Sequence, residues 1–203
     1  MARGNYLAVR RRQELARNAG PKVEIPQGSK IIVADVSGSM GMNDCQEGKR
    51  RIDILREALA PMEGRAYVIE FGIYGRRADH NGFPSTRCTT PASISEPSGG
   101  TPMDQGLARA AGLEPETVLL MSDGRADDPW RAKDAAKLLA KECIIDTLFI
   151  GPSDPVGEQL LREIAEIGRG SFDVFDITKT TSLLLESKVE SMLALPAPKI
   201  IEL

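Results

Sequence analysis

Five apolar runs separated by helix-like segments dominate this sequence of 203 residues. The runs are rich in β-branched side chains and lie at 30–36, 66–72, 117–122, 143–151 and 172–176. Most of them are continuously apolar rather than alternating, which is typical of strands buried on both faces of a parallel sheet. The sequence therefore predicts a layered protein in which helices cover both sides of a central sheet.

The segments between these runs place apolar residues at the three- and four-residue spacing of helices. The helical positions are Ile52, Leu55, Leu59 and Met62; Ala132, Ala135, Ala136, Leu139 and Ala140; and Leu160, Leu161, Ile164 and Ile167. A last helix is expected from about residue 179 to 195, where Pro196 would end it. Thr101, Asp128 and Asp154 each precede a proline, and we expect each to cap the start of a helix.

Strands that alternate with helices predict an α/β fold, with a Rossmann-like, doubly wound and mostly parallel sheet flanked by helices. The stretch 73–100 breaks the alternation because it is long and rich in Gly, Pro, Ser and Thr. Its short run at 87–90 is predicted to add one antiparallel edge strand. We expect a basic extension at 1–27, one domain at 28–196 and a short tail at 197–203.

Charge and cysteine content limit the classes of partner and compartment. The net charge is −3, and the first 28 residues carry six basic and two acidic side chains, so the rest of the chain is acidic. An acidic domain is a poor match for nucleic acid, which leaves only the N-terminal arm for that role. Three cysteines without a CxxC spacing, and no apolar run of about 18 residues, predict a cytoplasmic protein without a membrane span.

Oxygen-bearing side chains follow two predicted strands and precede one predicted helix. The first strand leads into Asp35-Val36-Ser37-Gly38-Ser39, and the strand at 117–122 leads into Asp123. Thr101 follows Gly99-Gly100 at the expected start of a helix. Ligands of doubly wound sheets bind at the carboxyl ends of the strands. We therefore expect these carboxylates and hydroxyls to converge on one edge of the sheet.

Two carboxylates and three hydroxyls, with no histidine or cysteine among them, form a donor set for a hard cation such as Mg²⁺. Ser37 and Ser39 could ligate the metal directly, because Gly38 lets their loop curl. Asp35 and Asp123 could hold the metal's water molecules and orient the serines. Such a site would leave one coordination position open to an oxygen ligand from outside.

These three segments, in this order, resemble the metal ion-dependent adhesion site (MIDAS) of the von Willebrand factor type A (VWA) domain, and the resemblance covers about residues 28–196. It implies that Ser37, Ser39 and Thr101 contact the metal directly or through water, and that Asp35 and Asp123 act mainly through water. It also implies Mg²⁺, with Mn²⁺ or Ca²⁺ as alternatives, and a partner protein whose Glu or Asp completes the coordination. Intracellular proteins of this kind commonly work in multiprotein assemblies, often beside AAA+ ATPases.

Two other functions are open at the level of sequence. A metal-dependent hydrolase or phosphatase could use Asp35, but Ser37 stands where a haloacid-dehalogenase-like phosphatase would have its second carboxylate. The chain also has no GxxxxGK(S/T) phosphate loop and no GxSxG elbow. A nucleic-acid adaptor could use the N-terminal arm. The sequence favours a non-enzymatic interaction module over both.

Simpler structural roles are also open for the same residues. Ser37-Gly38-Ser39 could form an ordinary turn, and Thr101 could serve only as a helix cap. Asp127 is left out of the predicted site. The charged loop at 42–51 borders the site, and we expect its charges to be solvated unless they contact a partner.

Overall fold

A six-stranded sheet with the order β3-β2-β1-β4-β5-β6 forms the centre of the protein. The computed structural model describes residues 29–46, 48–73 and 85–194, so the predicted N-terminal extension and C-terminal tail lie outside the described residues. The strands are β1 Lys30–Asp35, β2 Tyr67–Ile73, β3 Ser85–Thr89, β4 Thr117–Ser122, β5 Ile144–Ile150 and β6 Arg169–Phe175. All neighbouring strands are parallel except β2 and β3, which confirms the predicted sheet with one antiparallel edge strand.

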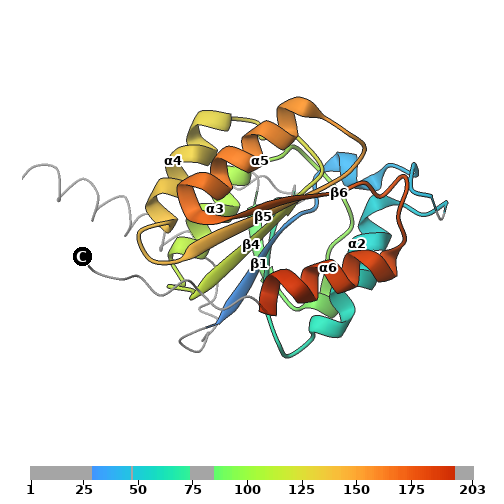
Figure 1. The fold of residues 1–203 in the computed structure, drawn as a ribbon, viewed down its shortest axis with the longest axis horizontal. Helices are drawn as coiled ribbons and strands as arrows, with labels where there is room; N and C mark the ends of the chain where they lie inside the picture. Colours follow the sequence, from blue (N-terminus) through green and yellow to red (C-terminus); the bar gives the residue numbers. More distant parts are fainter. Residues whose placement is uncertain (1–28, 47, 74–84, 195–203) are drawn as a thin grey trace, which may run out of the picture.

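Helices cover both faces of this sheet (Figure 1). The helices are α2 Arg51–Leu59, α3 Met103–Ala111, α4 Pro129–Leu139, α5 Pro155–Gly168 and α6 Ser182–Ala194, with short 3-10 turns η1 Gly38–Gly41, η2 Ala60–Met62 and η3 Pro91–Ser93. Helices α3, α4 and α5 lie on one face, while α2 and α6 lie on the other. The carboxyl ends of the four central parallel strands therefore meet at one edge between the two helical layers.

Strand β1 shows why its apolar run is continuous. Ile32 and Ala34 pack into the core beneath α2 and α6, whereas Ile31 and Val33 pack into the core beneath α3, α4 and α5. Both faces of the strand are buried because successive side chains point to opposite sides of a sheet. Ile32 lies opposite Val68 of β2 and Leu119 of β4 in register, so β1 is fixed in the middle of the sheet.

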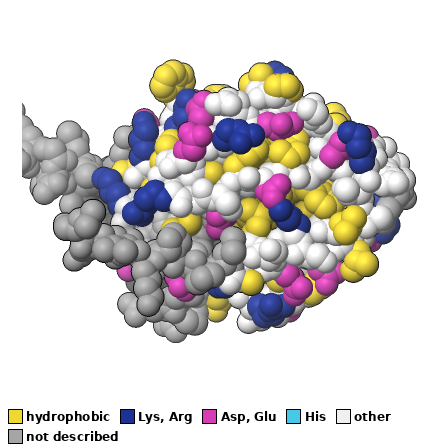
Figure 2. All heavy atoms as spheres, viewed as in Figure 1, with side chains coloured by type: hydrophobic (Ala, Val, Ile, Leu, Met, Phe, Trp, Pro, Cys, Tyr) yellow, Lys and Arg dark blue, Asp and Glu magenta, His cyan; other side chains and the backbone are white. Residues whose placement is uncertain are grey.

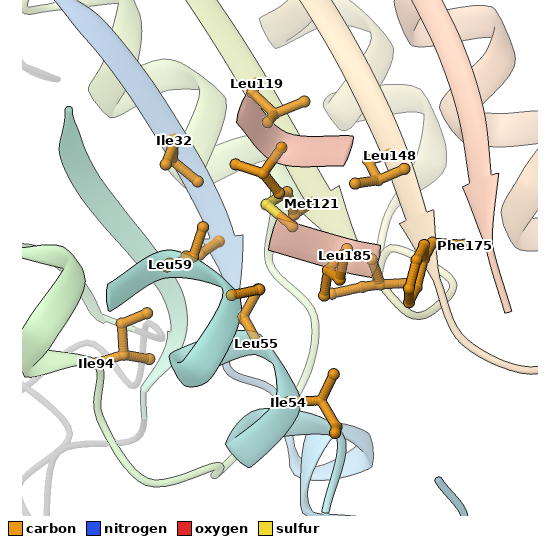
Figure 3. Packing of buried hydrophobic residues seen from close by; sticks show 14 of the residues in the cluster. Ile32, Ile54, Leu55, Leu59, Ile94, Leu119, Met121, Leu148, Phe175 and Leu185 are labelled. Atoms are coloured by element: carbon orange, nitrogen blue, oxygen red, sulfur yellow. The ribbon is translucent and has the colours of Figure 1, made fainter. Parts of the chain in front are cut away.

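The core beneath α2 and α6 is shown in Figure 3. Leu119 and Met121 of β4 face Leu55 of α2 and Leu185 of α6 across the layer. These side chains are buried, and each fully buried aliphatic side chain contributes about 1.5–3 kcal/mol. This packing holds α2 against the sheet and thereby places its first residue, Arg51, beside the carboxyl ends of the strands.

Two of the three predicted helix caps are confirmed. The Asp128 carboxylate accepts hydrogen bonds from two backbone N–H groups at the start of α4, and Asp154 accepts one at the start of α5. The prediction that Thr101 caps a helix is wrong, because α3 begins at Met103 and Pro102 occupies the capping position. Strand β6 begins at Arg169, three residues before the predicted start, and Arg169 also ends α5 in a left-handed backbone conformation.

The surface carries mixed charges on the face drawn in Figure 2, where basic and acidic side chains are interspersed. This distribution agrees with the small net charge of the chain. Within the described ranges, every helix is too short or too polar to cross a membrane.

Candidate metal centre

Asp35 ends β1 as a fully buried carboxylate that organises the turn after it. Its Oδ1 accepts the backbone N–H of Ser37 at 2.8 Å, and its Oδ2 accepts the hydroxyl of Ser122 at 2.5 Å. Burial and then the negative charge of Asp123 raise the pKa of Asp35 to about 7, although the hydrogen bonds from Ser122 and Ser37 oppose this rise. A nearby cation would favour the ionised form of this carboxyl.

The two serines and Asp123 form a continuous chain of oxygen atoms. The hydroxyls of Ser37 and Ser39 lie 3.0 Å apart, and the Ser39 hydroxyl donates to Oδ1 of Asp123 at 2.8 Å. Ser37 is buried and Ser39 is half-buried, so the chain of oxygens runs from the interior toward the surface. The structure thus brings together four of the five predicted side chains, since Asp35 holds the backbone of the same turn.

Gly72 of β2 lets this turn lie directly against the sheet. Its φ is +107°, which side chains rarely permit, and a Cβ there would lie 2.6 Å from the backbone nitrogen of Ser37. The N–H of Val36 also donates to the carbonyl of Phe71 at 2.9 Å. Strand β2 therefore packs directly against the serine turn, and only glycine fits at position 72.

Thr101 is joined to the site through its backbone. The N–H of Gly38 donates to the carbonyl of Gly99 at 3.0 Å, and the N–H of Asp127 donates to the carbonyl of Thr101 at 3.0 Å. The segment that carries Thr101 is thus tied both to the serine turn and to the loop after Asp123. Within the part of the chain that the structure describes, the Thr101 hydroxyl has no hydrogen-bond partner. Thr101 itself is half-buried.

Arg51 is a site residue that the sequence analysis missed. Its side chain is only 6% exposed, and its Nη1 donates to Oδ2 of Asp123 at 2.6 Å. Its Nε donates to Oδ1 of Asp44 at 2.9 Å, and Nη2 donates to the other oxygen of the same carboxylate. The expectation of a solvated charged loop at 42–51 is therefore wrong for Arg51. Its helical spacing from Leu55 and Ala58, which are both buried, was the signal that could have found it.

Asp127 and Ser122 were also left out of the predicted site. A Cβ on Gly100 would lie 2.6 Å from an oxygen of Asp127, so the Asp127 carboxylate packs against the segment that leads to Thr101. Ser122 bonds Asp35 as described above and is fully buried. Ser122 directly precedes Asp123 at the end of β4, and this position was the signal that could have found it, whereas the role of Asp127 depends on a contact with Gly100 that no sequence pattern predicts.

The donor set fits a hard divalent cation that is held largely by hydroxyl groups. Within the described ranges, no cluster of three or more His, Cys, Asp or Glu side chains could hold a metal. A metal at this edge would therefore depend on Ser37, Ser39 and Thr101, with carboxylates nearby. Mg²⁺ accepts such a set because it prefers oxygen ligands and keeps several of its water molecules.

Comparison with known proteins identifies the fold. No protein-family model and no curated protein matches the sequence. The von Willebrand factor type A structure from Catenulispora acidiphila superimposes with a TM-score of 0.58 at 19% identity, over 83% of this chain and 42% of that chain. The SpRpn10 VWA domain gives a TM-score of 0.55 at 12% identity, over 83% of this chain and 98% of that one.

A third similar structure is an aerotolerance-related membrane protein from Bacteroides fragilis NCTC 9343, with a TM-score of 0.53 and 17% identity, over 82% of this chain and 98% of that chain. At such identities the likeness concerns the fold alone. The described part of the chain has the Rossmann-like fold of VWA domains. The predicted fold class is confirmed.

Proposed function

We propose that this chain is a non-enzymatic interaction module that binds Mg²⁺ at the carboxyl edge of its sheet and recognises an acidic residue of a partner protein. The observation that carries the proposal is the chain of oxygens from Ser37 through Ser39 to Asp123, with the segment that carries Thr101 hydrogen-bonded to the same turn through its backbone. VWA-fold proteins are typically interaction modules, and this supports the same class of function.

Each residue of the site has a distinct role in this proposal. Ser37, Ser39 and Thr101 would hold the metal through their hydroxyl groups, while Asp35 and Asp123 would act on its water molecules and orient the serines. The bound metal would supply a positive centre with a position for an outside carboxylate. Mn²⁺ or Ca²⁺ could take the place of Mg²⁺, because both also prefer oxygen ligands.

The placement of Asp35 favours recognition over hydrolysis. A carboxylate nucleophile must be able to reach a substrate, but Asp35 is 0% exposed and both of its oxygens accept hydrogen bonds. The single histidine, His80, lies outside the described residues. Asp35, the nucleophile that the hydrolase alternative would use, is therefore not accessible to a substrate.

Exposed apolar side chains near the site support a protein partner. Met42 is 54% exposed and its N–H donates to the carbonyl of Ser39, so it lies directly beyond the serine turn. Trp130 is 75% exposed in the first turn of α4, three residues after Asp127. Large apolar side chains of this kind commonly anchor partner proteins. We propose a cytoplasmic partner with a Glu or Asp, and an assembly that contains an AAA+ ATPase as its setting.

A magnesium titration tests the metal site. Mg²⁺ at about a hundredfold excess over its Kd should raise the melting temperature by about 5–10 °C, because ligand binding to the folded state adds about 2.7 kcal/mol. The double variant Ser37→Ala and Ser39→Ala should lose this rise. Ser153→Ala, which removes an exposed hydroxyl from the loop after β5, should retain it. An equal rise in the wild type and the double variant would exclude the proposed ligands.

A further inference from the structure

Arg51 is the one buried cation among the described residues, and its two charged partners are both carboxylates, while the sulfur of Met42 accepts a further hydrogen bond from it. Its guanidinium group lies between Asp123 in the candidate metal centre and Asp44 in the neighbouring loop. The Asp44 carboxylate is 36% exposed, whereas that of Asp123 is 0% exposed. Arg51 therefore connects the interior of the site to the surface loop beside it.

The position of Arg51 is unfavourable for the helix that carries it. Arg51 is the first residue of α2, where the helix dipole favours a negative charge rather than a positive one. The backbone N–H of Arg51 donates to the carbonyl of Met42 at 3.1 Å, so the loop before the helix also fixes its location. Helix stability does not explain this arginine, whereas its contact with Asp123 does.

The contact gives Asp123 a permanent positive neighbour. A guanidinium group does not lose its proton in proteins. Burial alone would lower the pKa of Arg51, but the hydrogen bonds with Asp44 and Asp123 together outweigh burial and raise this pKa. One oxygen of Asp123 is occupied by this cation, and the other accepts the Ser39 hydroxyl. A divalent ion near Ser39 would have to share Asp123 with an existing positive charge.

Building on the proposed function, we infer that Arg51 is a resident counter-cation, which neutralises Asp123 and lowers the affinity of the site for a divalent metal. Two like charges close together in a partly buried site repel each other more strongly than they do in water. The arginine also satisfies the buried carboxylate when no metal is bound, so the folded site does not depend on the ion. Asp44 holds the guanidinium from the opposite side.

Calorimetric titration of the full chain with MgCl₂ tests this inference. Arg51→Gln and Arg51→Met both remove the charge, and each should bind Mg²⁺ about tenfold more tightly than the wild type. Arg51→Lys keeps a positive charge but loses the guanidinium fork that joins Asp44 to Asp123, so it should bind Mg²⁺ more tightly than the wild type and less tightly than the neutral variants. Arg50→Met is the matched control, because Arg50 is the adjacent arginine but bonds Asp53 and Glu96 instead of the site. Its affinity for Mg²⁺ should be unchanged.

The outcomes separate this inference from the proposed function. A neutral Arg51 variant that is folded by circular dichroism, but binds Mg²⁺ no more tightly than a binding wild type, would overturn the inference alone. A lysine variant that binds as tightly as the neutral variants would do the same, because charge would then not be the cause. Binding by the neutral variants without binding by the wild type would support the counter-cation and revise the proposed function. Absence of binding in all variants would overturn both.

Discussion

The side chains of the candidate centre differ in how many hydrogen bonds each makes within the fold. Asp35 is bonded on both oxygens, and Asp123 is bonded to a serine on one oxygen and an arginine on the other. The hydroxyls of Ser39 and Thr101 lie nearer the surface. The carboxylates are therefore held in place by hydrogen bonds. In the proposed function, the hydroxyls are the groups that would change partner when a ligand binds.

The raised pKa of Asp35 predicts a pH-dependent stability for the metal-free protein. The pKa rises from an ordinary 3.8 to about 7 on folding, so between these values the folded chain holds a proton that the unfolded chain has released. Its stabilising contribution is complete below the unfolded value and is lost as pH rises through about 7. In EDTA, the free energy of unfolding of the wild type relative to Asp35→Asn should fall by at most about 1.4 kcal/mol per pH unit.

Urea denaturation at about pH 5, 6, 7 and 8 measures this difference. The asparagine variant is the control, since it cannot titrate at this position while the other acids are unchanged. A difference between the two proteins that is constant across this range would show that Asp35 is ionised in the folded state.

At the scale of helices and strands, local patterns located most elements, and tertiary contacts decided the exceptions. The strands were predictable because both of their faces are buried, as in β1 and β4. The start of α3 was not, because Thr101 uses its carbonyl to accept the N–H groups of Met103 and Asp127. The spacing of Arg51 from Leu55 and Ala58 could have indicated that it is buried, but not that its partner is Asp123, which is 72 residues away. Such pairings depend on strand order, which no local pattern encodes.

The cap of α4 gives a prediction at this scale. Asp128→Ala should lower the free energy of unfolding by about 1 kcal/mol, because two N–H groups at the start of the helix lose their acceptor. Asp134→Ala in the same helix is the control, since Asp134 is exposed and, among the described residues, makes only a surface ion pair with Lys137. Urea denaturation should show a change below about 0.5 kcal/mol for the control. Equal losses in the two variants would mean that the cap contributes nothing specific.

At the scale of the whole molecule, a layer of helices packs on each face of the sheet. The candidate centre lies at the carboxyl ends of the central strands, between the two helical layers. Two of the three site segments, those at Asp35 and Asp123, are predictable as strand ends, because a doubly wound sheet places its binding edge there. The exposed apolar side chains of Met42 and Trp130 were harder to predict, because their exposure depends on how the loops pack. In the proposed function, these two side chains would contact the partner beside the metal.

Partner capture is the prediction that belongs to this scale. The immobilised full chain should retain a protein from a lysate of its own cell in Mg²⁺, and EDTA should release it because the proposed contact runs through the metal. The Ser37→Ala and Ser39→Ala double variant should not retain it, whereas Ser153→Ala should. Quantitative mass spectrometry of the eluates measures the loss. Retention that survives both EDTA and the double variant would place the binding surface elsewhere.

The long sequence separation within the candidate centre has a kinetic consequence. Ser39 and Asp123, which share a hydrogen bond, are 84 residues apart, and the segment that carries Thr101 comes from between them. These groups meet only after β1 and β4 have paired, so the unfolded chain offers an ion no comparable set of ligands. A cation that binds only the completed set acts late on the folding route. If the proposed metal site is correct, the cation would lengthen the lifetime of the native state by slowing unfolding, while the rate at which the chain first folds would be almost unchanged.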